Sequence, residues 1–480
     1  MLLFKSVLLV VLALLLVLGS GSAVVFLVAV IASTTVAFTE LYQWLTHPTQ
    51  IRLLRTLSLS ILLAYSFGTM IFMLANATLH APAVQYWRSQ GMVYDQNGLS
   101  VALAMTLCAS SALLILTHFE PALFPNGIEL LPSGPAAERL LWTGVAIVVL
   151  ALVTGSIGYQ GVARDASNHI SPLGALATML APPLVPYAIL LLKTANTSRN
   201  RKPVIRVALL VLIAVLLVLG RRYLVYVMLL CVLAWSFTGS AQRSRLPPVW
   251  MFLAAPVVLY VGFYFFFALR QAVDSLGPNH GLATYVREAW SFMNGKDAAT
   301  LRDALHANIG SRPFILSYPA GLLSQYADNV PLMGKEAVYS VQSAIPSVLM
   351  PLKTASLAPS VEALTHPYYG LPVFDGANTA VTAGLDDFGW IGAILYPMLL
   401  TALFILYYKI VRSLLSAPTL AFVSLTLLFQ VLYVEQGPSS VFVTIRDLTL
   451  VLLIFAVVNV VFSSATFMLH NDVRASGGVK

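Results

Sequence analysis

Long uninterrupted apolar stretches recur along this chain, and they restrict its possible folds more than any other feature. Many of them run for about 17 to 25 residues, enough for an α-helix to cross roughly 30 Å of hydrocarbon. A transmembrane strand would instead need alternating polar and apolar residues, which these stretches lack. Because 59% of the residues are hydrophobic and only 10% are charged, a water-soluble core is excluded. The sequence therefore predicts an all-α, polytopic integral membrane protein.

Hydropathy predicts about 12 membrane-spanning helices, with one long connection between the ninth and the tenth. The predicted spans lie near residues 2–18, 22–45, 56–80, 99–118, 140–160, 172–192, 204–220, 223–239, 249–269, 386–408, 416–434 and 447–468. Residues 1–269 thus carry the first nine spans, residues 270–385 form a large external loop, and residues 386–480 carry the last spans and a cytoplasmic tail. We expect short helices packed on the membrane in the loop, because it is rich in aromatic and apolar residues.

Basic residues gather in alternate connections, which sets the predicted orientation. They are Arg52, Arg55, Lys193, Arg199, Arg201, Lys202, Arg243, Arg245, Lys409, Arg412, Arg474 and Lys480. The positive-inside rule places these connections and both termini in the cytoplasm. It also accounts for the formal charge of +8, so we expect no nucleic-acid partner. The connection 119–139 fits poorly, because Glu120, Glu129 and Glu138 outnumber Arg139.

Two features near the apolar segments bear on processing and redox chemistry. Residues 1–22 carry Lys5, an apolar run and the small residues of 19–22, which is also the pattern of a secretory signal peptide. A second apolar span follows at once, so we expect the first helix to be retained. Cys108 and Cys231 both lie inside apolar runs, where they pack in the lipid phase rather than form an external disulfide.

Several arginines are predicted to lie at the external membrane boundary. Arg221 and Arg222 form the external end of a tight helical hairpin, and Arg164, Arg270 and Arg446 fall at the same depth. Snorkelling to lipid headgroups would explain an isolated pair. Five arginines at one level instead favour diphosphate binding, because guanidinium groups form paired hydrogen bonds with phosphate oxygens.

More than one external residue is a candidate general base. The carboxylates are Glu435, Asp386 and Asp387, and the histidines of the long loop are His280, His306 and His366. General-base catalysis needs only one of them, and the others can be solvated residues or partners of arginines. Glu435 is the first choice because it abuts the membrane beside Gly437. Asp387 is the second choice, with helix capping as its alternative role.

Local metal and nucleotide motifs are absent from the sequence. It contains no Asp-x-Asp, no His-Glu-x-x-His, no cysteine and histidine cluster and no Walker glycine loop. We therefore expect no cofactor and no catalytic metal. An enzyme of this kind would use an activated substrate and arginine cations instead.

An ordered set of short motifs gives the second half of the chain a family resemblance. The set is Gly220-Arg221-Arg222, Ile345-Pro346-Ser347 with Pro351 and Lys353, Asn378-Thr379, Asp387-Phe388-Gly389 with Gly392, and Glu435-Gln436-Gly437 before Ser440 and Arg446. In this order and spacing the chain resembles the Wzy-type oligosaccharide repeat-unit polymerases of bacterial surface polysaccharides. The first 140 residues add only span count and topology to the resemblance.

The resemblance implies a GT-C-like glycosyltransferase that acts at the outer face of the bacterial inner membrane. Two polyprenyl-diphosphate-linked oligosaccharides would meet there, and inverting, metal-independent transfer would join them. Arg221 and Arg222 would stabilise the leaving diphosphate, while Arg164, Arg270 and Arg446 would hold the second diphosphate or the glycan. The partners implied are membrane lipid, a flippase and a chain-length regulator.

Two other functions fit parts of the same pattern. A glycan ligase would use the same lipid-diphosphate donor, and the histidines of the long loop keep that reading open. A transporter or flippase fits the span count, but such proteins usually show internal repeats and ionisable groups near the bilayer midplane.

Overall fold

The computed structural model is helical throughout the part of the chain that it describes. It describes residues 2–79, 95–124, 132–157, 171–193, 201–219, 221–237, 249–277, 280, 282–295, 298–311, 315–325, 331–346, 348–373, 376, 378–435 and 437–476. The first helices are α1 (Leu2–Leu18), α2 (Ala23–Thr46), η1 (Pro48–Gln50), α3 (Leu53–Ile61), the π-helical η2 (Leu62–Phe67), α4 (Gly68–Leu79), α6 (Gln96–Leu116) and η3 (Thr117–Phe119). The middle helices are α7 (Gly134–Val153), α8 (Pro172–Lys193), α9 (Lys202–Leu219), α10 (Arg221–Ser236) and α11 (Val249–Leu276).

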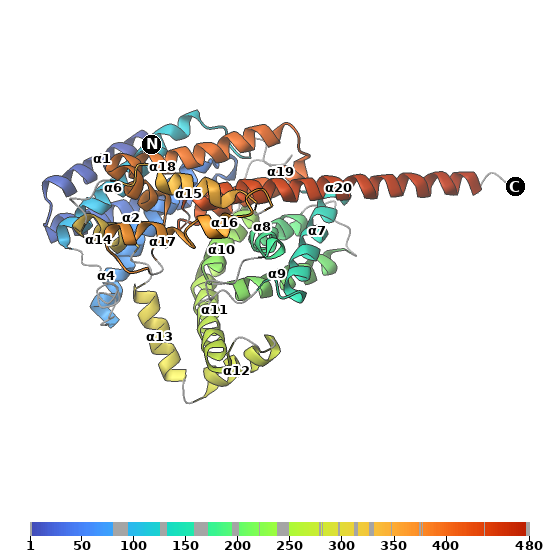
Figure 1. The fold of residues 1–480 in the computed structure, drawn as a ribbon, viewed down its shortest axis with the longest axis horizontal. Coiled ribbons are helices and arrows are strands. Elements are labelled where there is room, and N and C mark those ends of the chain that lie inside the picture. Colours follow the sequence, from blue (N-terminus) through green and yellow to red (C-terminus); the bar gives the residue numbers. More distant parts are fainter. Residues whose placement is uncertain are drawn as a thin grey trace.

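Short helices follow between the last residues of α11 and the next long helix. They are α12 (Leu282–Asn294), α13 (Ala298–Ser311), α14 (Ser317–Gln325), α15 (Lys335–Ala344), α16 (Lys353–Ser356), α17 (Val361–Thr365) and η4 (Pro367–Tyr369). The chain then forms α18 (Ala380–Arg412), α19 (Ala417–Leu432) and α20 (Pro438–Ser476). Figure 1 shows α15 lying beside α20 and below α18 in the centre of the molecule.

Seven of the described helical segments are long and apolar enough to cross a membrane, so the protein is a helical membrane protein. They are Ala23–Thr46, Leu53–Leu74, Gln96–Phe119, Gly134–Val153, Pro172–Lys193, Ala380–Arg412 and Pro438–Phe462. Shorter apolar helices cover Leu2–Leu18, Tyr223–Ser236 and Ala417–Leu432. The remaining predicted spans, 204–220 and 249–269, coincide with α9 and α11. The total of 12 stays a prediction.

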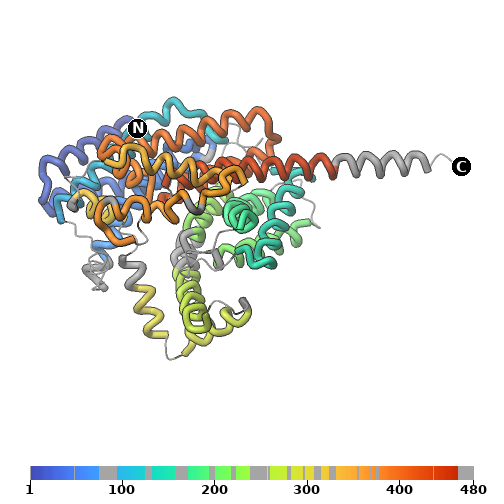
Figure 2. The backbone as a smooth tube through the Cα atoms, viewed as in Figure 1, coloured from blue at the N-terminus to red at the C-terminus, as the bar shows by residue number. Residues whose placement is uncertain are grey.

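The described parts of the helices pack into two large apolar clusters and one small one. The first joins α7, α8, α9 and α10 to α19 and the second half of α18, and the second joins α1, α2, α3, α6 and α14. The small cluster ties α11 to α12 and α13 through residues such as Phe267, Tyr285 and Leu305. Figure 2 shows α11 to α13 as an arm that projects from the main bundle.

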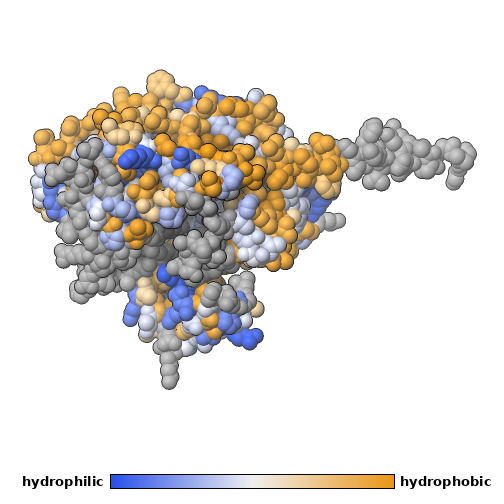
Figure 3. Space-filling view, viewed as in Figure 1, coloured by the Kyte–Doolittle hydropathy of each residue, from blue (hydrophilic) through white to orange (hydrophobic). Residues whose placement is uncertain are grey.

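The outer surface of the main bundle is strongly apolar. Exposed side chains include Phe4, Leu14 and Leu18 of α1 and Leu399 and Leu406 of α18. Figure 3 shows hydrophobic residues over the broad upper face of the bundle and a mixture of hydrophilic and hydrophobic residues over the arm formed by α11 to α13. An exposed apolar surface of this extent is expected of a protein whose bundle faces lipid.

One end of the bundle is held by a buried ion network. Glu40 accepts hydrogen bonds from Lys5 Nζ at 2.5 Å and from Arg55 Nε at 2.6 Å, and Gln43 contacts both cations. The three charged residues come from α1, α2 and α3 and are nearly inaccessible. Charges buried in this way must be paired, so the network fixes the three helices to one another.

Two acidic residues of the connection 119–139, Glu120 and Glu138, have structural partners, and Glu129 lies outside the described residues. Glu120 accepts the backbone N–H of Leu53 at 2.5 Å and of Leu54 at 2.9 Å, which caps the first turn of α3. Burial raises the pKa of Glu120 to about 7 in spite of these bonds. Glu138 lies inside α7 and forms an ion pair with Arg201. Glu120 and Glu138 therefore have local roles, in capping and in pairing, that the charge rule does not consider.

Candidate functional site

The site begins with a break in α18. Phe388 has φ −138° and ψ 20°, and Gly389 has φ 63° and ψ −145°, so the helix is interrupted there. Glycine favours such a left-handed backbone because it has no Cβ. The helix itself begins at Ala380, earlier than the predicted span start at 386, because Thr379 forms a capping box with Thr382.

The first part of α18 folds back along the second part. Thr379 and Leu400 line the same pocket, although they would be about 30 Å apart in one straight helix. The close approach depends on two glycines. A Cβ on Gly384 would lie 2.1 Å from the Gly392 carbonyl oxygen, and a Cβ on Gly392 would lie 2.0 Å from that of Gly384. Residues 380–387 therefore form a short helix enclosed by the bundle.

The break leaves backbone carbonyls that a distant segment satisfies. The carbonyl oxygens of Asp386 and Asp387 lose their helical partners and accept the N–H groups of Leu332 at 2.8 Å and Met333 at 2.9 Å. Met333 has φ 54° and Gly334 has φ 86°, which turns the chain directly into α15. Segment 332–337 is thus attached to the end of the short buried helix.

The Asp387 side chain completes this attachment by capping α15. Its carboxylate accepts the backbone N–H of Glu336 and of Ala337, each at 3.0 Å, and the hydroxyl of Tyr396. A carboxylate at a helix N-terminus satisfies unpaired N–H groups and the positive end of the helix dipole. Asp387 is fully buried. It caps α15, therefore, rather than the tenth predicted span as the sequence suggested.

Two more carboxyl groups are buried beside Asp387, and both have an oxygen without a partner. Glu336 is 1% exposed and Asp386 is 2% exposed. Among the described residues, Glu336 Oε2 and Asp386 Oδ1 accept no hydrogen bond. Burial, followed by the charges of Asp386, Asp387 and Glu362, raises the pKa of Glu336 well above its ordinary value. Burial and the neighbouring negative charges both disfavour the ionised form of Glu336 in this cluster.

The connection between α19 and α20 lies directly over this cluster. A Cβ on Gly437 would lie 3.7 Å from Glu336 Oε1, so the chain next to Glu435 contacts the buried carboxyl group. Glu435 itself is only partly buried and acts electrostatically on Tyr65, whose hydroxyl lies 2.8 Å from Thr379 Oγ1. The structure thus places Gly437 against Glu336, whose backbone N–H is bound by Asp387.

Two cations lie at the opposite end of α15. Arg446 Nη1 donates to the Ala344 carbonyl at 2.9 Å, and Lys353 Nζ donates to the Ile345 carbonyl at 2.8 Å and to that of Ser343. Arg446 also pairs with Asp447 at 2.6 Å. The cations lie at the negative end of the helix dipole, while Asp387 lies at the positive end. Helix α15 therefore separates an acidic site from a basic one.

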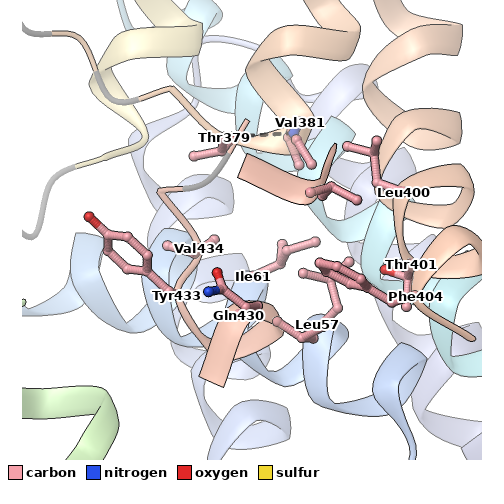
Figure 4. Close-up of a pocket in the computed structure, with 13 residues that line it drawn as sticks. Leu57, Ile61, Thr379, Val381, Leu400, Thr401, Phe404, Gln430, Tyr433 and Val434 are labelled. Carbon is pink, nitrogen blue, oxygen red and sulfur yellow. Dashed lines mark hydrogen bonds between the residues drawn. The ribbon is translucent and has the colours of Figure 1, made fainter. Parts of the chain in front are cut away.

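A small apolar pocket extends below the start of α18. Figure 4 shows it enclosed by α3, both parts of α18 and the end of α19. The Oε1 atom of the Gln430 side chain, which lines the pocket, has no partner among the described residues. The space open to the centres of water molecules is about 30 Å³, which suits one or two waters rather than a sugar.

The three candidate histidines lie outside the carboxyl cluster or are fully bonded. His366 is buried, with Nε2 2.8 Å from the Tyr318 hydroxyl and Nδ1 3.1 Å from the Pro372 carbonyl. Burial lowers its pKa. His280 and His306 belong to the arm, where they approach Tyr285 and Tyr260.

The predicted arginine site is only partly visible. Arg164 lies outside the described residues, and only the backbones of Arg221 and Arg222, at the start of α10, are described. Arg270 lies on α11 with an exposed side chain 3.9 Å from Asp274. The convergence of five arginines therefore stays a prediction, and Arg446 is the one that adjoins α15.

Sequence reasoning missed Glu336 and assigned no role to Lys353. The start of α15 at Gly334, with an acidic residue in the first turn, is a recognisable helix beginning. Its proximity to Asp386 depends on a contact across about 50 positions, which no local pattern encodes.

No cofactor site can be assigned to this cluster from its residues. Within the described parts of the chain, no group of three or more His, Cys, Asp or Glu side chains is placed to hold a metal ion. Comparison with protein-family models, curated proteins and solved structures finds no match to this chain.

Proposed function

We propose that this protein is a polysaccharide polymerase that joins polyprenyl-diphosphate-linked oligosaccharide repeat units by metal-independent, inverting glycosyl transfer. The observation that carries the proposal is the cluster of buried, partly unsatisfied carboxyl groups at Glu336 and Asp386, beneath the connection that contains Glu435. Such a cluster can accept and hold protons in a low-dielectric site. The motif resemblance supports the choice of substrate.

The proposed orientation follows from the distribution of charge along the helices. The end of the bundle at which Glu120 caps α3 is basic. The cations at or near this end are Arg52, Arg55, Lys409 and Arg412. Asp387 lies at the other end of α18. If the basic end is cytoplasmic, the carboxyl cluster faces the outside of the inner membrane. About 12 spans of GT-C type, with both termini in the cytoplasm, complete this topology.

The proposed reaction is one displacement. A hydroxyl of the acceptor glycan attacks the anomeric carbon of the donor, and its proton passes to Glu435, the carboxylate of this site that is partly exposed. The bond from that carbon to the donor diphosphate breaks, and the diphosphate leaves with the bonding electrons. Arg221 and Arg222 stabilise the charge that develops on the leaving oxygens. Asp387 serves as a structural cap, because its carboxylate is occupied by three donors.

One observation favours a second candidate function. The interrupted helix α18, with a buried short helix that begins at Ala380, is an arrangement that transporters use to bind substrates within the membrane. A flippase with this fold would move lipid-linked glycans without forming a bond. A glycan ligase is less favoured, since both ring nitrogens of His366 are occupied by structural partners and His280 and His306 belong to the arm formed by α11 to α13.

The test is an assay for chain growth with purified protein in lipid. We expect a ladder of products from a polyprenyl-diphosphate-linked repeat unit in the presence of a chelator. Arg221→Gln and Glu435→Gln should each slow it by about a hundredfold or more, while folding normally. Glu288→Gln on α12 is the matched control and should leave the ladder unchanged.

Three other outcomes would change the assignment. Lipid-linked glycan that crosses the bilayer without elongation would establish the transporter. Transfer onto an added lipid-core acceptor would establish the ligase. A ladder that persists in Arg221→Gln and Glu435→Gln would keep the function and refute these residue roles.

A further inference from the structure

The cations at the end of α15 form a pair that is not fully neutralised. Arg446 and Lys353 bind the carbonyls of three consecutive residues, 343–345, so their side chains lie next to each other. Asp447 pairs with Arg446. Among the described residues Lys353 has carbonyl partners but no carboxylate partner. The pair therefore keeps about one unit of positive charge.

The depth of this pair follows from the helix that carries Arg446. That residue lies within Pro438–Phe462, one of the segments long and apolar enough to span a membrane. Ionisable residues inside a span are costly and are usually functional. Lys353 binds the carbonyl next to the one that Arg446 binds, so a membrane crossed by this segment would hold both cations at a similar depth.

The surface of that chain segment is apolar in the way a lipid contact requires. Val348 is 89% exposed, Leu349 is 76% exposed and Leu352 is 74% exposed. Three large apolar side chains beside two cations match a molecule with a hydrocarbon tail and an anionic head.

We propose that Lys353 and Arg446 bind the phosphate groups of a membrane-anchored lipid, whose hydrocarbon chain packs on Val348, Leu349 and Leu352. Under the proposed function, on which this identity rests, the lipid is the polyprenyl diphosphate of the acceptor. The donor's diphosphate is bonded to the attacked carbon, so it must lie at the reaction centre, on the face of that carbon opposite the base. Helix α15 has ten residues and is therefore about 15 Å long. The diphosphate head of one acceptor would bind at the end with Lys353 and Arg446, and its distal sugar would reach the end with Glu336.

The first experiment measures lipid binding without any sugar. Native mass spectrometry of the full chain in phosphatidylcholine nanodiscs is titrated with polyprenyl diphosphate, and inorganic diphosphate is used in a separate arm. We expect Lys353→Gln to weaken polyprenyl diphosphate binding about tenfold or more, and Lys409→Gln, a cation at the other end of α18, to leave it unchanged. Leu349→Ser should weaken binding of the lipid but not of inorganic diphosphate.

Equal binding by Lys353→Gln and Lys409→Gln would overturn the proposal. Inorganic diphosphate that binds as tightly as the lipid, with no effect of Leu349→Ser, would overturn the assignment to a lipid. If Lys353→Gln weakens lipid binding but the natural chain forms no ladder, the lipid site is supported and the polymerase is refuted. A ladder that forms while Lys353→Gln leaves lipid binding unaffected would support the polymerase and refute this lipid site.

A second measurement does not depend on removing a cation. A spin label at Leu349→Cys, in a chain with Cys108→Ser and Cys231→Ser, should be more accessible to oxygen than to a water-soluble nickel chelate. A label at Asp303→Cys on α13, where the side chain is exposed, should show the opposite preference. A water-accessible label at 349 would contradict the membrane depth of the segment.

Discussion

The carboxylate of Asp387 accepts the backbone N–H of Glu336 at 3.0 Å, so the residue that ends one helix caps the first turn of another. This bond attaches α15 to the broken end of the short buried helix in α18. It also brings the Glu336 side chain into the cluster that contains Asp386. The architecture of the candidate site depends on this one relationship more than on any single motif.

Replacement of Asp387 should affect α15 rather than the chemistry. Asp387→Asn keeps one acceptor oxygen and should lower the free energy of unfolding by about 1 kcal/mol, whereas Asp387→Ala should cost about 2 kcal/mol. Hydrogen exchange at the amides of Glu336 and Ala337, with thermal unfolding in nanodiscs, measures both. Asp95→Ala, which removes the cap of α6 at Gly98, should loosen α6 and leave α15 protected. Lost activity with fully protected amides in Asp387→Asn would instead make Asp387 the base.

The buried carboxyl group of Glu336 should make stability depend on pH. Its pKa in the folded protein is raised by burial, so its stabilising effect is fully present below the unfolded value, about 4.3. That effect is lost as pH rises through the folded pKa. The melting temperature of the natural chain should therefore fall from pH 5 to pH 8. Glu336→Gln should flatten this dependence, and Glu288→Gln should not. Identical slopes in the natural chain and both variants would contradict the raised pKa of Glu336.

Substitutions of different residues in the ion network of α1, α2 and α3 should destabilise the protein to different extents. Glu40→Gln leaves Lys5 and Arg55 buried without a counter-charge and should destabilise the protein by about 3 to 5 kcal/mol. Lys5→Met should cost much less, since Glu40 keeps its bond to Arg55. Thermal unfolding in detergent compares the two variants. Similar losses would mean that the cations do not share Glu40 as described.

The contact between Gly384 and Gly392 should tolerate no side chain. Gly384→Ala would place a methyl group 2.1 Å from a backbone oxygen, which a neighbouring side chain cannot relieve, and should cost about 1 to 3 kcal/mol or more. Gly262→Ala on α11 is the control, because its Cβ would meet only Leu224 Cδ1 at 3.5 Å. That variant should be neutral or stabilising by up to about 1 kcal/mol. Unfolding measurements that show equal effects would refute the folded-back form of α18.

Some features of this protein follow from local sequence alone. The apolar stretches determine helices such as α2, α6 and α8 almost to their ends, because length and hydropathy act on residues that are neighbours along the chain. The same locality made Glu435 and Asp387 recognisable as acidic residues at helix ends.

Other features were decided by tertiary structure. The break at Gly389 ends one helix where hydropathy predicts a single span. It frees two carbonyls that accept the N–H groups of Leu332 and Met333, which lie about 50 positions earlier in the chain. Glu336 joins Asp386, and Lys353 joins Arg446, across separations of about 50 to 100 positions. Such pairs depend on which helices pack together, because the need to satisfy buried polar groups is met by whatever the packing brings near.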